Sequence, residues 1–156
     1  MIDIEIEDDR WSEALPDAQT LVARAAEAAL AGAGRTGGVV VLLTDDAAQH
    51  ALNQQFRGKD SSTNVLSFPA PENPEDHLGD ISLAYEVCAA EARDQAKPIA
   101  HHLQHLVAHG VLHLVGYDHE TDAEALEMEG LEREVLAGLG VPDPYKAERG
   151  DDGEFR

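Results

Sequence analysis

The amino-acid sequence predicts an α+β fold in which one mixed β-sheet of about four strands packs with several helices. Strand patterns crowd the first half of the chain and helical patterns dominate the second, which is typical of this class. A length of 156 residues is close to the common size of one domain, and 43% hydrophobic residues supply a core. We expect one domain over residues 1–148 and a disordered acidic tail over residues 149–156.

Four segments have the patterns of β-strands. Apolar and acidic residues alternate over residues 2–7, which indicates a half-buried strand. Val39–Leu43 is a continuous apolar run, typical of an interior strand. Val65–Phe68 is predicted to be a short strand, and alternation around residues 81–83 predicts a fourth.

Apolar residues at helical spacing predict five helices between and after these strands. Pro16 suits the first turn of the first helix, because the N–H that proline lacks has no partner there. The last helix is expected to begin with a capping box, in which Thr121 and Glu124 bind each other's backbone N–H groups. The predicted helices cover residues 16–32, 44–56, 85–97, 99–115 and 122–139.

The chain is strongly acidic. It carries 31 Asp and Glu against 11 Lys and Arg, a formal charge of −20, which opposes binding to a polyanion because phosphates gain affinity from basic residues. Much of this charge lies in one stretch that we interpret as a solvated helix face, whereas Arg57 and Lys59 form a small basic spot. The acidic residues of that stretch are Asp118, Glu120, Asp122, Glu124, Glu127, Glu129, Glu132 and Glu134.

The sequence also predicts where in the cell the protein is found. The N-terminus lacks the basic start and apolar stretch of a signal peptide, and no apolar run approaches the roughly 18 residues that a membrane span requires. We therefore expect a cytoplasmic protein with no membrane partner. Cys88 is the single cysteine, so the chain forms neither an internal disulfide nor a thiolate metal cluster, and we expect Cys88 to be a buried apolar side chain.

The segment HGVLHLVGYDH (His109–His119) has a spacing suited to metal binding. Residues four apart on a helix lie about 6 Å apart, so His109 and His113 can both bind one ion. Gly116 can adopt the left-handed conformation that ends a helix, which lets His119 return to the same ion. We expect these three histidines to hold one divalent ion and to leave one position open for water.

An open position marks a catalytic site, because closed structural zinc sites use four protein ligands and usually cysteine. The other histidines have simpler interpretations. His101 and His105 lie one to two turns before the helix end, so we interpret them as polar surface residues or as residues that support the ligands. His50 and His77 stand alone and are expected to be solvent-exposed.

The spacing of the three histidines and the glycine equals that of the metzincin proteases. Those enzymes need a Glu directly after the first histidine as general base, which is worth about 10²–10⁴ in rate. Here that position is Gly110, and Met128 lies in a helical pattern rather than in a Met-turn. A zinc peptidase is therefore disfavoured.

Four segments, in order along the chain, carry a resemblance to a known family. They are FRGKDSSTNVLSFP (Phe56–Pro69), LGDISLAYE (Leu78–Glu86), HGVLHLVGYDHE (His109–Glu120) and DPYKAE (Asp143–Glu148). They resemble the YbeY family of bacterial rRNA-maturation endoribonucleases. The resemblance implies an α+β fold, a metal taken to be Zn²⁺, and cleavage of single-stranded RNA. It also implies maturation of the 3′ end of 16S rRNA and ribosome quality control beside the small ribosomal subunit and its proteins.

The resemblance further implies roles for individual residues. The three histidines of the metal motif would be the ligands, and Arg57 would be the basic residue of the active cleft, where it binds a phosphate as its charge grows. The nucleophile stays open between water and the RNA 2′-hydroxyl. No general base is identified, and Asp118 is interpreted as a carboxylate that orients His119. The residues interpreted as turn caps or strand-edge residues are Thr63, Asn64, Ser67 and Asp80.

Two other functions remain open on the sequence. One is a zinc peptidase, which Gly110 disfavours. The other is a non-catalytic ribosome-assembly factor that keeps a metal for stability and meets RNA only beside a protein partner, which suits so acidic a chain.

Overall fold

A mixed sheet of four strands forms the centre of the protein, as predicted. The computed structural model describes residues 2–57 and 63–145, without the side chains of Phe56 and Arg57. The acidic tail expected over residues 149–156 lies outside the described residues.

The sheet contains β1 (Ile2–Ile6), β2 (Gly38–Thr44), β3 (Val65–Pro69) and β4 (His77–Ala84) in the order β1-β2-β4-β3. The first three in this order are parallel neighbours, and β3 pairs antiparallel with β4. Each strand overlaps a segment that the alternation or apolar run predicts. The two edges of the sheet are β1 and β3.

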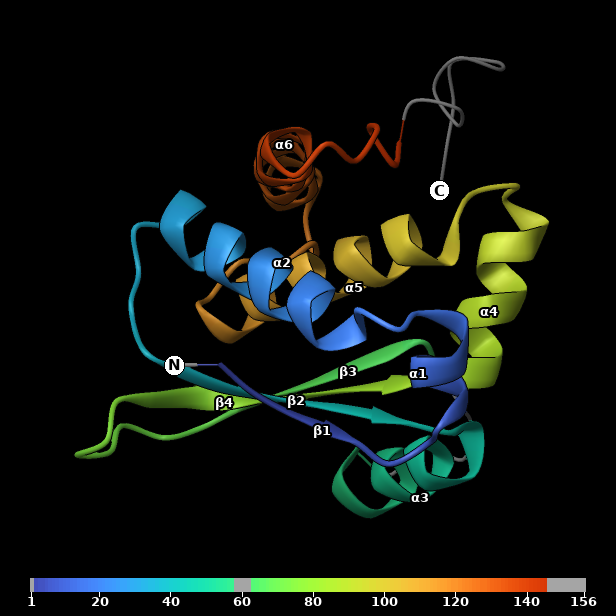
Figure 1. Cartoon of the computed structure of the whole chain (residues 1–156). Helices are drawn as coiled ribbons and strands as arrows, with labels where there is room; N and C mark the ends of the chain where they lie inside the picture. Colours follow the sequence, from blue (N-terminus) through green and yellow to red (C-terminus); the bar gives the residue numbers. More distant parts are fainter. Residues whose placement is uncertain (1, 58–62, 146–156) are drawn as a thin grey trace.

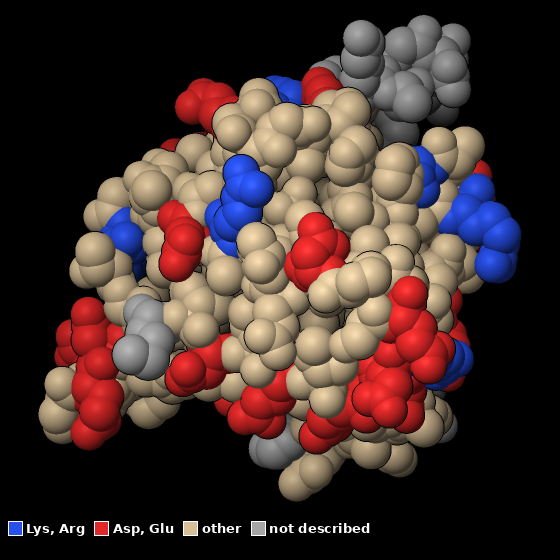
Figure 2. All heavy atoms as spheres, viewed as in Figure 1, with Lys and Arg blue, Asp and Glu red and all other residues tan. Residues whose placement is uncertain are grey.

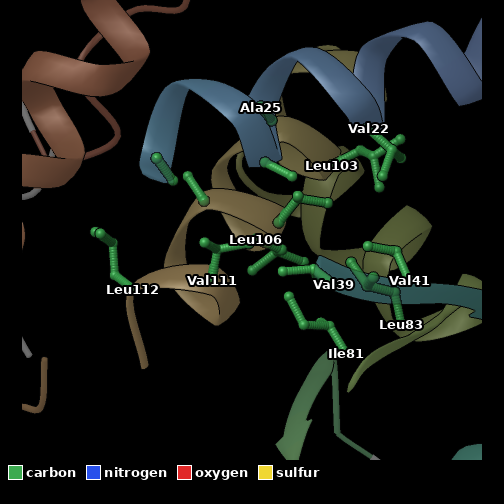
Figure 3. Packing of buried hydrophobic residues seen from close by; sticks show 14 of the residues in the cluster. Val22, Ala25, Val39, Val41, Ile81, Leu83, Leu103, Leu106, Val111 and Leu112 are labelled. Carbon is green, nitrogen blue, oxygen red and sulfur yellow. The ribbon is translucent and has the colours of Figure 1, made fainter. Parts of the chain in front are cut away.

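One face of the sheet is covered by α2 (Ala18–Gly32) and α5 (Ile99–Leu114), and α6 (Asp122–Gly138) packs on these two helices from outside (Figure 1). Valine, leucine and isoleucine side chains of α2, α5 and the strands meet in this layer with almost no exposed surface (Figure 3). Burying each such side chain stabilises the fold by roughly 1.5–3 kcal/mol. These contacts fix α5, the helix that carries the histidine motif.

A short helix that was not predicted, α1 (Arg10–Ala14), follows β1. Its Trp11 is fully buried, and the indole N–H donates a hydrogen bond to the carbonyl oxygen of Thr44 at 3.0 Å. Pro16 lies in the turn between α1 and α2, so its expected place in a first helical turn was wrong. Burial of the indole orders this segment. The helix was not predicted because five residues offer too few periodic positions.

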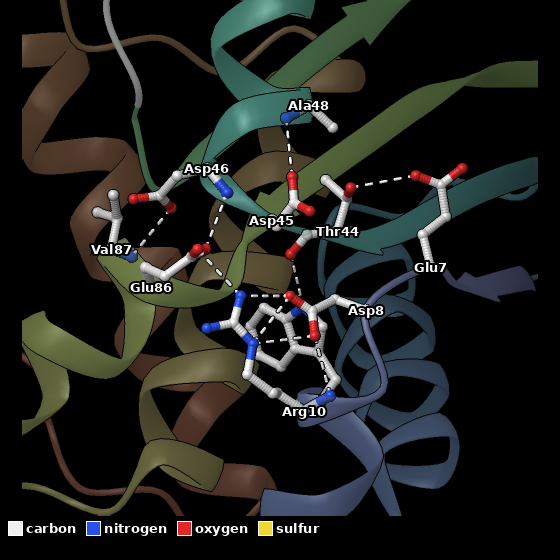
Figure 4. A network of polar contacts seen from close by, with 10 residues as sticks. Glu7, Asp8, Arg10, Thr44, Asp45, Asp46, Ala48, Glu86 and Val87 are labelled. Atoms are coloured by element: carbon white, nitrogen blue, oxygen red, sulfur yellow. Dashed lines mark hydrogen bonds and ion pairs between the residues drawn. The ribbon is translucent and has the colours of Figure 1, made fainter.

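The opposite face of the sheet carries α3 (Asp46–Arg57), and α4 (Tyr85–Asp94) lies at one end of the sheet (Figure 1). A polar network joins their first turns to α1 (Figure 4). The Arg10 guanidinium contacts Glu86 at 3.0 Å, and Glu86 accepts a hydrogen bond from the backbone N–H of Asp46 at 2.9 Å. Because Arg10 and Glu86 are exposed, this ion pair adds little stability.

The helices also bear on the membrane question. None of those within residues 2–57 and 63–145 is both long enough and apolar enough to cross a membrane.

Candidate metal centre

His109 and His113 lie one turn apart near the C-terminal end of α5. Their Nε2 atoms are 3.1 Å apart, and their ring centroids are 4.6 Å apart. Two nitrogens bound to one tetrahedral zinc ion at about 2.0–2.1 Å would be about 3.3 Å apart. The structure thus brings the two side chains together as the sequence predicts for ligands of one ion.

The other nitrogen of each ring is held by a hydrogen-bond acceptor. Nδ1 of His109 donates to Oε2 of Glu132 at 2.7 Å. Nδ1 of His113 donates to the carbonyl oxygen of Tyr117 at 2.9 Å. These oxygens only accept, so each neutral ring carries its proton on Nδ1 and presents the Nε2 lone pair. Two lone pairs directed at one point fit a divalent cation, which supports a metal site here.

His119 joins this pair from the loop after α5. Gly116 has a φ of 107°, the left-handed conformation predicted for the helix end, and turns the chain back. The ring of His119 stacks against that of His109 with 5.7 Å between centroids, and it lies 5.0 Å from that of His113. One nitrogen from each of the three rings lies within 4.8 Å of the other two. The predicted capping box, which is confirmed, holds the far end of this loop at Thr121.

The surroundings of His113 favour its neutral form. Burial lowers the pKa of His113 below its ordinary value, and the nearby rings of His109 and His119 lower it further. Burial also lowers the pKa of His105, one turn earlier on α5. Because an imidazole binds a metal only when it is neutral, these shifts favour a metal over a proton.

A buried carboxylate supports two of the histidines. Glu132 of α6 has no exposed surface, and its Oε1 accepts hydrogen bonds from Nε2 of His105 at 3.0 Å and from the Tyr145 hydroxyl at 2.5 Å. Burial alone would raise the pKa of Glu132, but hydrogen bonds from His105 and His109 lower it well below its ordinary value. The interpretation of Glu132 as part of a solvated face was therefore wrong.

A signal for Glu132 is present in the sequence. It lies four residues after Met128 and four before Leu136, both of which are buried, so it falls on the apolar stripe of α6. A charged residue on such a stripe almost always has a partner. The other acidic residues of the 118–134 stretch are exposed or half-buried, as expected.

The histidines open into a cleft of about 870 Å³. Its lining includes Asn53, Ser67 and Tyr145, and among the residues that the structure describes it contains no Lys or Arg. Asp118 and Glu120 add acidic groups to the lining. The negative charge of the chain is also visible in Figure 2, where acidic side chains are grouped over the lower half of the face. The described part of the cleft therefore offers acidic groups and no basic side chain to a ligand.

Arg57 is the last residue of α3. The side chain of Arg57 and the whole of Lys59 lie outside the described residues. Asn53, one helical turn before Arg57, is buried and contributes to the lining of the cleft. Arg57 therefore ends a helix that borders the cleft.

The position after the first histidine is closely packed against the sheet. A β-carbon on Gly110 would lie 3.0 Å from Cγ2 of Ile81 and 3.2 Å from Oγ of Ser67, closer than side chains normally pack. The Ser67 hydroxyl also donates a hydrogen bond to the carbonyl oxygen of Gly110 at 3.1 Å. Because α5 approaches the sheet so closely, a side chain at position 110, such as the Glu of a metzincin, would have to displace Ile81 or Ser67.

The smaller polar residues bind mainly to the backbone. Asp118 accepts a hydrogen bond from the backbone N–H of His119 at 2.8 Å, so this bond holds the loop rather than the ring. Asn64 accepts one from the backbone N–H of Val65 at 2.6 Å and donates one to Glu91 at 3.0 Å. These bonds agree with local capping, although Thr63, Asn64 and Ser67 also line the cleft.

The remaining predictions concern Cys88 and four other histidines. His50 and His77 are half-buried rather than fully exposed, and His77 contacts Asp80 at 2.7 Å. His101 is half-buried. His105 contacts Glu132, which agrees with its interpretation as a residue that supports the ligands. Cys88 is fully buried, as expected, and burial raises the pKa of its thiol.

The α+β fold and the three histidines clustered in an open cleft define a protein with a candidate metal centre. A family model described as Endoribonuclease YbeY matches residues 3–140. The chain therefore belongs to the endoribonuclease YbeY family and is a hydrolase of phosphodiester bonds, which confirms the resemblance.

Individual relatives agree with this assignment. The chain is 53% identical over 152 residues to Endoribonuclease YbeY of Azorhizobium caulinodans, which covers 92% of this chain and 95% of the relative. It is 54% identical over 135 residues to Endoribonuclease YbeY of a Chelativorans species, with 80% and 81% covered. A solution structure of a Thermotoga maritima protein has 30% identity and a TM-score of 0.64, and the match covers 100% of this chain and 97% of the other.

Proposed function

We propose that this protein is a metal-dependent endoribonuclease that cuts single-stranded RNA, matures the 3′ end of 16S rRNA and takes part in ribosome quality control. Its partners would be rRNA and the small ribosomal subunit with its proteins, in the cytoplasm. Membership of the endoribonuclease YbeY family supports an RNA substrate. The facing Nε2 atoms of His109 and His113, 3.1 Å apart, carry the metal dependence.

In this proposal His109, His113 and His119 hold one divalent ion. Three nitrogen ligands without cysteine suit Zn²⁺ at an open, catalytic site. When bound, such an ion polarises a phosphoryl oxygen and makes a water molecule more acidic, both of which assist phosphodiester cleavage. The protein's part is to keep the rings neutral and oriented.

Arg57 is proposed to bind the phosphate that is cut. It ends α3 one turn after Asn53, which lines the cleft. A guanidinium offers two parallel donors to a phosphate and stabilises the charge that grows there during cleavage. With no Lys or Arg in the described lining, Arg57 would be a main source of positive charge for the reaction.

Cleavage of a single-stranded RNA under single-turnover conditions tests this function. We expect cleavage by the metal-loaded protein, no cleavage with excess chelator, and recovery when Zn²⁺ is returned. His113→Ala should lose both the ion, by elemental analysis, and the cleavage. Full retention of the ion would show that the ligand set is wrong.

One observation favours a second candidate, a non-catalytic ribosome-assembly factor. The chain has a formal charge of −20, and the described cleft lining lacks basic residues. Such a factor would bind the metal for stability and meet RNA only beside a protein partner. Metal-loaded protein that leaves every RNA uncut, alone and with small ribosomal subunits, would decide for this candidate.

A further inference from the structure

A fully buried carboxylate lies directly behind the candidate metal site. Glu132 comes from α6, whereas the histidines that it contacts come from α5. Each of its two oxygens accepts hydrogen bonds from different donors. Oε2 accepts from His109 at 2.7 Å, and Oε1 accepts from His105 at 3.0 Å and from the Tyr145 hydroxyl. A buried carboxylate is costly unless it is paired in this way.

The contact with His109 determines which nitrogen faces the cleft. The carboxylate accepts from Nδ1, so the proton stays on Nδ1 and the Nε2 lone pair points toward His113. The two bonds on Oε1 keep the carboxylate from rotating away. An imidazole with the opposite tautomer would direct an N–H at the metal position and could not bind.

We infer that Glu132 is a positioning residue of the metal site, which fixes the ring and the tautomer of His109 from behind, with Tyr145 and His105 fixing Glu132. The inference rests on the proposal that His109 and His113 hold the metal. Outer partners of this kind typically contribute 10–100-fold to metal affinity. A rival arrangement also exists, because His105, His109 and Glu132 themselves bring three possible ligand atoms within 4.8 Å.

Glu132→Gln is the most direct test. An amide offers one acceptor and one donor, so it cannot accept from His109 on one side and from His105 and Tyr145 on the other. We expect the Zn²⁺ affinity of the folded variant, measured by competition with a chelator, to fall by about 10–100-fold. In the metal-free protein, NMR of the ring nitrogens should show His109 protonated on Nδ1 in the wild type and a mixture of tautomers in Glu132→Gln.

Two further variants serve as controls. Glu134→Gln removes an exposed carboxylate from the same helix and should change neither measurement. His105→Gln distinguishes positioning by Glu132 from the rival arrangement, in which His105, His109 and Glu132 bind the metal. If Glu132 positions His109, this variant should still bind Zn²⁺, weakened by no more than Glu132→Gln, because the Tyr145 hydroxyl still holds Oε1. Loss of Zn²⁺ as complete as in His113→Ala would make His105 and Glu132 ligands and overturn the inference.

The inference is also overturned if folded Glu132→Gln binds Zn²⁺ as the wild type does and keeps the His109 tautomer. A purely structural role would lower the unfolding temperature without moving either measurement. Failure of RNA cleavage in metal-loaded wild type would refute the proposed function alone, because neither Zn²⁺ affinity nor the tautomer depends on RNA.

Discussion

Replacing Gly110 with alanine measures how closely α5 packs on the sheet beneath the histidines. In the interior of a helix, Gly→Ala is worth about 0.8–1.0 kcal/mol of stability. At Gly110 the added carbon would lie 3.0 Å from Ile81 and 3.2 Å from Ser67. Overpacking of this kind costs about 1–3 kcal/mol, so we expect Gly110→Ala to range from neutral to about 2 kcal/mol less stable.

Gly130→Ala is the matched control, because Gly130 also lies inside a helix, α6. The nearest atom to an added carbon there is the flexible end of Arg133, at 3.9 Å. This variant should therefore show the full gain of about 0.8–1.0 kcal/mol. The difference between the two variants, about 1–3 kcal/mol, isolates the cost of crowding.

Urea unfolding of both variants and the wild type, with chelator present so that metal binding does not contribute, gives the free energies directly. Equal slopes on denaturant would show that the same surface is exposed in each case. If Gly110→Ala gained as much stability as Gly130→Ala, α5 could move off the sheet. A side chain at position 110 would then fit, and close packing would no longer exclude a peptidase base.

Three other predictions concern the site. Metal affinity should fall as the pH drops below about 6.5, because protonated imidazole does not bind metal. Since burial lowers the pKa of His113, protonation of this ring should begin below that pH. Constant metal occupancy down to about pH 5 would argue against histidine ligands. Arg57→Ala should keep the fold and the metal but lose about 10²-fold in cleavage rate at saturating RNA, and Arg57→Lys should recover part of that rate. If Arg57→Ala reached the wild-type rate at saturating RNA, Arg57 would be a binding residue only. If Arg57 and Lys59 are the phosphate contacts, a plot of log affinity for single-stranded RNA against log salt concentration should have a slope no steeper than about −1.4, about −0.7 for each contact. A slope near −4 would require more basic residues at the RNA.

The parts of the structure that sequence predicts well depend on near neighbours in the chain. His109 and His113 are one helical turn apart, so their meeting follows from the helix alone, and the left-handed φ of Gly116 follows from its place at the helix end. The alternation of residues 2–7 likewise placed β1 to within one residue.

The parts that sequence missed depend on contacts between distant elements. Glu132 contacts His109 across two helices, and only the packing of α6 on α5 turns its position on an apolar stripe into a buried partner. Tyr145 reaches the same carboxylate from beyond the last helix, which no local pattern indicates. Trp11 similarly orders α1 through a bond to Thr44 on β2.

The two edges of the sheet bear on how copies of this protein behave toward one another. β1 is an edge strand whose exposed Asp3 and Glu5 share one face, so two β1 strands that pair antiparallel can place these like charges opposite each other. β3 has five residues and ends in Pro69, which has no N–H to offer a further strand. These acidic residues therefore oppose sheet extension between molecules. Neutralising Asp3 and Glu5 would make the protein more prone to aggregate.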